Sequence, residues 1–257
     1  MRKYTFGNIT AVVMFIACLL IAAQTVYAAS PADTALRTAA KHQRYAFVTF
    51  YRPNDATSMK MLAAVKSIEG KLADRADFVS VDMSNQANWT VISRYGANRS
   101  PMPLTIVVAP NGAVTAGYPT AINVDADFSG VFVSPGQAAV LKVMQESRIA
   151  VVCLQNEKTK YNSECTANAN ALRKDQRVGS VVTLVTIDPA DPAEAKFMQQ
   201  AKIDTNSPNA RIVVFAAPGK VIGTFDGNTP PATISASLQR SLGGGCSGGQ
   251  CGPGGCH

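Results

Sequence analysis

The sequence predicts an α/β protein made of two tandem units, each a mixed sheet flanked by helices. Three blocks of the first half recur in the second half, in the same order and 104 to 107 residues later. The matching blocks are 46–50 with 150–154, 78–82 with 184–188, and 104–114 with 210–221. Repetition at one period indicates a duplicated unit. The chain has 257 residues, of which 47% are hydrophobic and 16% charged, so it can bury a core.

The first 28 residues have the pattern of a signal peptide. Residues 1–10 carry two positive charges, residues 11–23 are an unbroken apolar run, and Val26 and Ala28 are small residues before a cleavage point. An apolar helix of this length reaches about 20 Å, short of the roughly 30 Å hydrocarbon core, so we expect no stable membrane span. The sequence therefore predicts an exported protein, periplasmic or secreted.

Charge gives little indication of a polyanionic partner. The formal net charge is +7, and removal of Arg2 and Lys3 with the signal peptide would lower it to +5. The basic residues are scattered, without the runs that are typical of nucleic-acid binding. We therefore expect no nucleic-acid partner.

Within each unit, the expected order is strand, helix, strand, helix, two strands joined by a hairpin, and a last helix. Helices are predicted at 59–72, 87–95 and 135–146 in the first unit, and at 164–174, 192–201 and 233–242 in the second. The hairpin turns contain Pro110-Asn111-Gly112 and Pro218-Gly219. The predicted domains are residues 30–146 and 147–242, followed by a tail at residues 243–257.

This order, together with Tyr95-Gly96 ahead of Met102-Pro103-Leu104 and an apolar strand, resembles the thioredoxin family over residues 40–242. The resemblance implies tandem thioredoxin-like folds and a cis peptide bond before Pro103. The matching place in the second unit falls near Asn209, with Pro208 one residue early. Thr49 takes the place of a buried acid in the family.

The same resemblance implies a Cys-x-x-Cys motif at the start of the first helix, where thiol–disulfide exchange takes place. The residues Lys60-Met61-Leu62 resemble those that follow the family's second cysteine. They place Ala56, Thr57, Ser58 and Met59 at the motif, and none of these is a cysteine. We therefore expect that the first unit cannot carry out exchange by itself.

Two cysteines of the second unit leave two interpretations open. Cys165 lies near the predicted start of a helix, where the helix dipole favours a thiolate, and Cys153 lies in an apolar strand. Cys165 would be a reactive thiol, alone or as a redox pair with Cys153. Alternatively, the two are structural, as a fixed disulfide or as two buried small apolar residues.

The tail has a composition of its own. Eight of its fifteen residues are glycine, so we expect it to be flexible until something binds. Cys246, Cys251, Cys256 and His257 match the donor set of zinc, and the three thiolates match that of copper(I). A redox arm, a haem attachment site and a low-complexity end with incidental thiols are the alternatives.

The leading hypothesis is an exported, non-enzymatic binding protein for an unknown protein or thiol partner, with a soft metal ion in its tail. The alternative is a thiol–disulfide oxidoreductase or isomerase-like protein that uses Cys165, Cys153 and the tail cysteines. A scaffold without any thiol function is a third possibility. The chain has only two histidines and offers no Ser-His-Asp set, and it has no glycine-rich phosphate loop with lysine.

Overall fold

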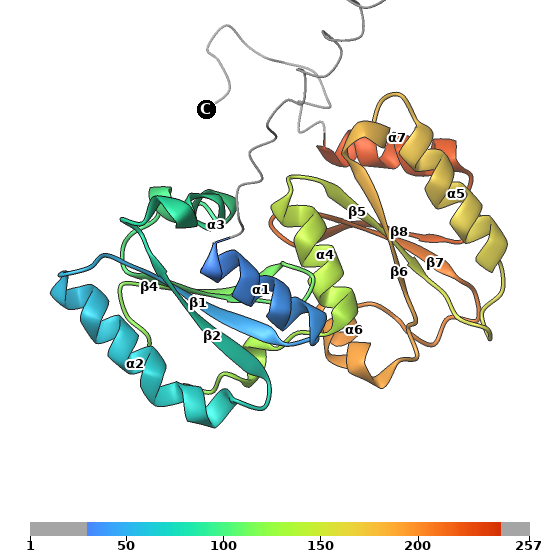
Figure 1. The fold of residues 1–257 in the computed structure, drawn as a ribbon. Helices are drawn as coiled ribbons and strands as arrows, with labels where there is room; N and C mark the ends of the chain where they lie inside the picture. The colour runs from blue at the N-terminus through green and yellow to red at the C-terminus, as the bar shows by residue number, and fades with distance from the viewer. Residues whose placement is uncertain (1–29, 243–257) are drawn as a thin grey trace, which may run out of the picture.

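The computed structural model describes residues 30–242, so the predicted signal peptide and tail lie outside the described residues. These residues form two successive units, each with one four-stranded sheet (Figure 1). The first unit contains α1 (Pro31–Lys41), β1 (Tyr45–Tyr51), α2 (Ala56–Leu72), β2 (Ala76–Asp82), α3 (Trp89–Arg94), β3 (Leu104–Val108) and β4 (Val114–Pro119). The segment that follows contains α4 (Pro135–Gln145), β5 (Ile149–Leu154), α5 (Asn162–Lys174), β6 (Val182–Ile187), α6 (Ala195–Gln200), β7 (Arg211–Ala216), β8 (Lys220–Asp226) and α7 (Pro231–Leu242). Across residues 30–242, the helices fall short of the length and apolar character that crossing a bilayer requires.

The two sheets have the same topology. Their strand orders are β2-β1-β3-β4 and β6-β5-β7-β8. In each sheet the first two strands pair in parallel, and the remaining pairs are antiparallel. Each hairpin also shifts register at an equivalent place, between Val107 and Val108 in one sheet and between Val214 and Phe215 in the other. Two α/β units with mixed sheets and thioredoxin-like topology are therefore present, as the sequence predicts.

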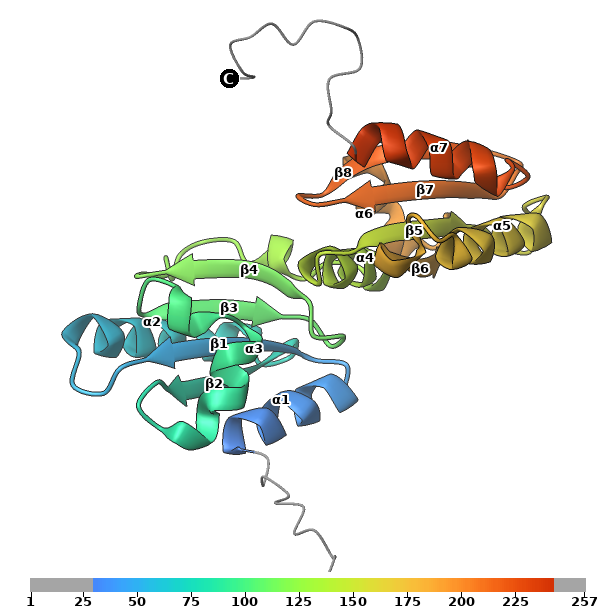
Figure 2. The same ribbon diagram turned by 90° about the horizontal axis from the view of Figure 1, so that it is seen from above.

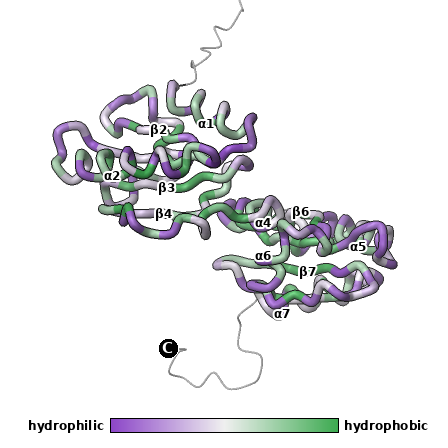
Figure 3. The backbone as a smooth tube through the Cα atoms, turned by 90° about the horizontal axis from the view of Figure 1, so that it is seen from below, coloured by the Kyte–Doolittle hydropathy of each residue, from purple (hydrophilic) through white to green (hydrophobic). Residues whose placement is uncertain are grey.

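Two layers of apolar side chains cover the first sheet. On one face, α1 and α3 contribute Leu36, Ala39 and Ile92 to a core that contains Val48 and Phe50. On the other face, α2 packs over Phe47 and Val107 together with the segment 121–133, which supplies Ile122, Phe128 and Val131. Within residues 30–242, β3 and β7 are among the strongly hydrophobic segments, as Figure 3 shows.

In the second sheet, α5 and α7 cover one face through residues such as Leu172, Ile234 and Leu238. On the opposite face, α6 supplies Phe197 and Met198, and α4 supplies Val140 and Val143. Both sheets are thus covered by helices on both faces.

Helix α4 differs from the expectation. We expected it to close the first unit, but it packs on the second sheet, beside β5 and β6 (Figure 2). The segment 121–133 covers the first sheet where a last helix was predicted. The contacts of α4 favour a boundary before Ser134 rather than after Glu146, and the domain limits stay a prediction.

The starts of α1 and α4 explain why the two helices correspond. The Ser30 hydroxyl accepts a hydrogen bond from Asp33 N at 3.1 Å, and the Ser134 hydroxyl accepts one from Gln137 N at 3.2 Å. In both helices proline follows the serine, and proline is favoured at the first helical position because its missing N–H would have no partner there. Thus α4 packs on the second sheet at the place where α1 packs on the first sheet.

Candidate functional site

The first turn of α2 is the place where the thioredoxin resemblance puts the redox motif. The helix begins at Ala56, three residues before the predicted start, so residues 56–59 form its first turn. We call Ala56, Thr57, Ser58 and Met59 the motif turn. Met59 is exposed and Ser58 is buried.

Hydrogen bonds hold the motif turn in place. The Asp55 carboxylate accepts a hydrogen bond from Ser58 N at 2.7 Å, and the Ser58 hydroxyl accepts one from Arg52 N at 3.1 Å. The hydrogen bonds from Ser58 lower the pKa of Asp55, so this cap is an ionised carboxylate at a helix N-terminus. The buried side chain of the motif turn thus carries a hydroxyl that holds the preceding loop, and not a thiol.

Two further positions that the thioredoxin resemblance marks, Thr49 and Pro103, carry no charge. The Thr49 side chain is buried, and its hydroxyl lies 3.0 Å from that of Thr105 on β3. The Met102–Pro103 peptide bond is cis. In residues 30–242 a second cis bond precedes Pro218, in the turn between β7 and β8, and not Pro208.

Cys153 and Cys165 lie together inside the second unit. Cys153 is on β5 and Cys165 is the fourth residue of α5, and they are 3% and 0% exposed. The Cys153 thiol donates to the Cys165 carbonyl at 3.7 Å, and the Cys165 thiol donates to the Arg211 carbonyl at 3.7 Å. The adjacent Cys153 thiol, together with burial, raises the pKa of Cys165. Cys165 is therefore a protonated thiol at neutral pH.

The repeat explains why Cys165 is buried. In α2 the buried side chains include Met61, Val65 and Ile68, and 104 residues later α5 buries Cys165, Ala169 and Leu172. Cys165 therefore occupies the core position of Met61 and lies beyond the equivalent of the motif turn.

Helix α5 does not begin where the sequence predicts, at residue 164. Tyr161 has left-handed backbone angles, and α5 begins at Asn162. The 104-residue offset would instead place the counterpart of Ala56 at Lys160, so α5 begins two residues later than the repeat implies. The sequence predicts Cys165 near a helix start and leaves open whether it is a reactive thiol or a buried structural residue, and the structure places it in the core. Extending the offset through the helix would have revealed it.

Close packing also covers Cys165 from the side of the β8–α7 turn. A side-chain carbon added to Gly227 would lie 2.9 Å from the Cys165 Cβ and 2.9 Å from the Ala210 carbonyl oxygen. The Gly227 N–H donates to that carbonyl at 2.7 Å. Because this contact leaves no space for a side chain, the turn shields the thiol from that direction.

The described part of the chain holds no cluster of three or more His, Cys, Asp and Glu side chains that could bind a metal ion. The candidate ligands Cys246, Cys251, Cys256 and His257 lie outside the described residues.

No protein-family model and no curated protein sequence matches the chain. Among solved structures, the first two thioredoxin domains of Saccharomyces cerevisiae Eps1p are similar at 12% identity, over 79% of this chain and 94% of that chain, with a TM-score of 0.27. The zinc-bound form of human ERp44 is similar at 14% identity, over 80% of this chain and 57% of that chain, with a TM-score of 0.31. The Drosophila melanogaster thioredoxin Deadhead is similar at 21% identity, over 34% of this chain and 78% of that chain, with a TM-score of 0.29.

Because these TM-scores are low, the strand order and register of the chain itself define its class. The described residues form two tandem thioredoxin-like folds.

Proposed function

We propose that this protein is an exported tandem thioredoxin-like binding protein that does not carry out thiol–disulfide exchange and whose tail binds a soft metal ion. The observation that carries the proposal is the motif turn, where Asp55 caps the helix, the Ser58 hydroxyl accepts a hydrogen bond from Arg52 N, and Ala56 and Met59 stand in place of the two cysteines. Export rests on the signal-peptide pattern of residues 1–28.

The two cysteines of the second unit support a binding role over a catalytic one. Exchange requires an accessible thiolate, because the thiolate is the nucleophile. Cys153 and Cys165 are buried, and the pKa of Cys165 is raised. We assign the pair a structural role.

The metal would bind in the tail, because Cys246, Cys251, Cys256 and His257 combine three thiols with an imidazole within twelve residues. Zinc favours tetrahedral sulfur and nitrogen ligands, and copper(I) favours thiolates. The partner that we expect for the globular units is a protein or a low-molecular-weight thiol.

Metal analysis tests the tail. Reduced full-length protein is loaded with Zn²⁺ or Cu(I), and the bound metal per chain is compared with that of a variant lacking residues 243–257. The matched control carries Cys153→Ser and Cys165→Ser with the tail intact. We expect the truncated protein to lose bound metal and the control to retain it. Equal metal content with and without the tail would contradict the proposal.

Insulin reduction tests the claim that exchange is absent, against the alternative of an oxidoreductase that uses Cys165, Cys153 and the tail cysteines. Wild type and Cys165→Ser should both remain at the uncatalysed rate in the presence of dithiothreitol. Activity in the wild type that is lost in Cys165→Ser would establish the oxidoreductase instead.

A further inference from the structure

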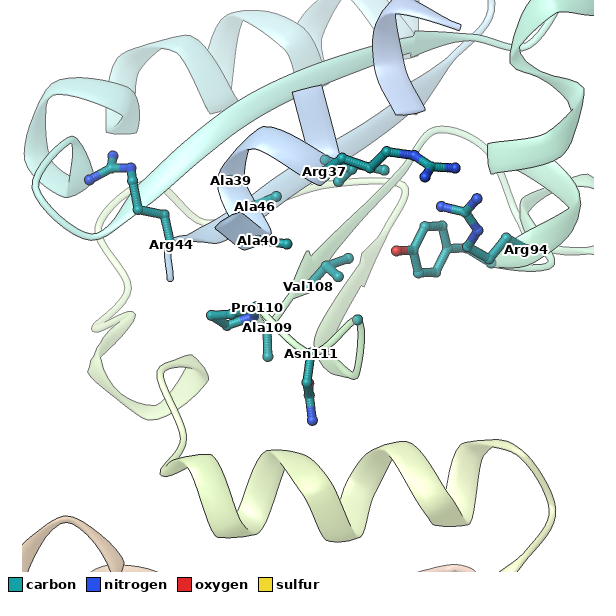
Figure 4. A pocket seen from close by; sticks show the side chains of 13 residues that line it. Arg37, Ala39, Ala40, Arg44, Ala46, Arg94, Val108, Ala109, Pro110 and Asn111 are labelled. Carbon is teal, nitrogen blue, oxygen red and sulfur yellow. The ribbon is translucent and has the colours of Figure 1, made fainter. Parts of the chain in front are cut away.

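A pocket lies outside all the sites discussed above, between α1, the end of α3 and the β3–β4 hairpin. Its volume is about 180 Å³. We call it the α1–hairpin pocket. Apolar side chains line much of it, including Leu36, Ala39, Ala46 and Val108. Figure 4 shows the guanidinium groups of Arg37 and Arg94 close together on one side, whereas the Arg44 side chain extends away from them.

A buried carboxylate holds these two arginines. The Asp33 side chain is 5% exposed and is not part of the pocket lining. It accepts a hydrogen bond from Arg37 Nε at 2.7 Å, and its other oxygen lies 2.8 Å from an Arg94 Nη. Both guanidiniums are therefore already positioned before any ligand arrives.

The charges around the pocket do not balance. Two guanidiniums share one carboxylate, and within residues 30–242 neither forms an ion pair with a second acidic side chain. One positive charge is therefore left at the pocket. Arg37 and Arg94 are 68% and 39% exposed, so N–H groups that do not contact Asp33 remain open to a ligand.

Tyr95 supplies another polar group in the lining. Burial raises the pKa of Tyr95, so its hydroxyl stays protonated at neutral pH. A neutral hydroxyl can donate a hydrogen bond to an anion without adding a repelling charge.

We propose that the α1–hairpin pocket binds a small organic carboxylate whose apolar body is about the size of one benzene ring. Arginine pairs with carboxylates through two parallel hydrogen bonds, and an apolar pocket with a few convergent polar groups is the usual form of a small-molecule site. An apolar cavity of about 150 Å³ is known to hold benzene, so the volume suits one ring. The proposal is independent of the motif turn and of the tail.

Benzoate is a suitable probe, because it joins one ring to one carboxylate. It is titrated into the full chain, and binding is followed through the backbone amides of Ala39, Ala40 and Gly112 by NMR. Benzamide keeps the ring without the charge, and acetate keeps the charge without the ring. We expect benzoate to bind at least about tenfold more tightly than either, since a charge-assisted hydrogen bond and ring burial each contribute that much.

Two variants test the two halves of the site. Arg37→Gln should weaken benzoate binding about tenfold, as expected for the loss of a charge-assisted hydrogen bond. Lys66→Gln is the matched control, because it removes one exposed positive charge from α2, away from the pocket. Ala40→Leu should abolish binding by filling the cavity while both arginines remain. Circular dichroism confirms that each variant is folded.

Several outcomes would overturn the proposal. Absence of amide shifts, or shifts only at other surfaces, would show that the pocket does not bind this ligand class. If benzamide binds as tightly as benzoate, the arginines do not contribute to binding. If acetate binds as tightly as benzoate, the site recognises only the anion. If Lys66→Gln weakens binding as much as Arg37→Gln, net charge alone is responsible.

Discussion

Asp33 joins two helices of the first unit through a single buried side chain. It lies in the first turn of α1, where a negative charge interacts favourably with the helix dipole, and it pairs with Arg37 of α1 and Arg94 of α3. Burial by itself would raise the pKa of Asp33. The hydrogen bonds and charges of the two arginines outweigh it and hold that pKa below its usual value. The ionised carboxylate therefore stabilises the docking of α1.

Asp33→Asn should lower the free energy of unfolding by about 2 kcal/mol at pH 7, through the loss of charge-assisted hydrogen bonds. Because the pKa of Asp33 is lowered in the folded state, its contribution is full above the unfolded-state value of about 3.9 and is lost as the pH falls through the folded-state value. Urea unfolding from pH 7 to pH 2 should show the difference between the two proteins shrinking below about pH 4. Asp125→Asn, at an exposed carboxylate, is the control. A difference independent of pH would exclude the role of the Asp33 charge.

The strands and most helices could be predicted from residue patterns, because buried strands form continuous apolar runs and the chain repeats them. Sequence reasoning predicts no helix at α1, although Ser30-Pro31 is a start signal that Ser134-Pro135 repeats 104 residues later. The position of α4 could not be predicted. An apolar stripe shows that a helix packs on a sheet, but it does not identify which of two similar sheets.

The candidate site could also be predicted only in part from the sequence. The occupants of the motif turn follow from the residues after it, and the structure places them in the first turn of α2. The burial of Cys165 could not be read from its position near a helix start. It follows instead from the repeat, which matches Cys165 to Met61, a buried residue of α2 that lies 104 residues earlier.

Two glycines test whether α4 belongs to the second sheet. A side-chain carbon at Gly136 would lie 2.6 Å from Glu194 Oε2 and 2.7 Å from Ile187 Cδ1, and both residues belong to the second unit. Gly136→Ala should therefore destabilise the protein by about 1–3 kcal/mol. Gly70→Ala in α2 meets nothing within 4 Å and should stabilise it by about 0.5–1 kcal/mol. Urea unfolding measures both. Stabilisation by both substitutions would contradict the packing of α4 against Glu194.

The two units meet through a small apolar contact and a few hydrogen bonds. Ala138 of α4 packs with Ala109 and Ala113 of the β3–β4 hairpin. The Tyr45 hydroxyl donates to the Val133 carbonyl at 2.6 Å, which ties the connecting segment to β1. Interfaces this limited allow relative motion of domains by default. The polar contacts therefore decide how firmly the units are held.

Gln145, at the end of α4, makes the most specific of these contacts. Its side-chain oxygen accepts a hydrogen bond from Val114 N at 2.9 Å, and its side-chain nitrogen donates to the Val114 carbonyl at 2.6 Å, as a neighbouring strand would. Gln145→Ala removes both hydrogen bonds and exposes the Val114 N–H and carbonyl to water. Amide hydrogen exchange at Val114 should accelerate about tenfold, the equivalent of one hydrogen bond.

Residual dipolar couplings should show, in the same variant, a wider range of orientations between the two sheets. Gln199→Ala, an exposed glutamine of α6, is the control and should leave both measurements unchanged. If Val114 exchanges at the wild-type rate in Gln145→Ala, the side chain does not hold the units together. The alanine contact and the Tyr45 hydrogen bond would then have to account for their arrangement.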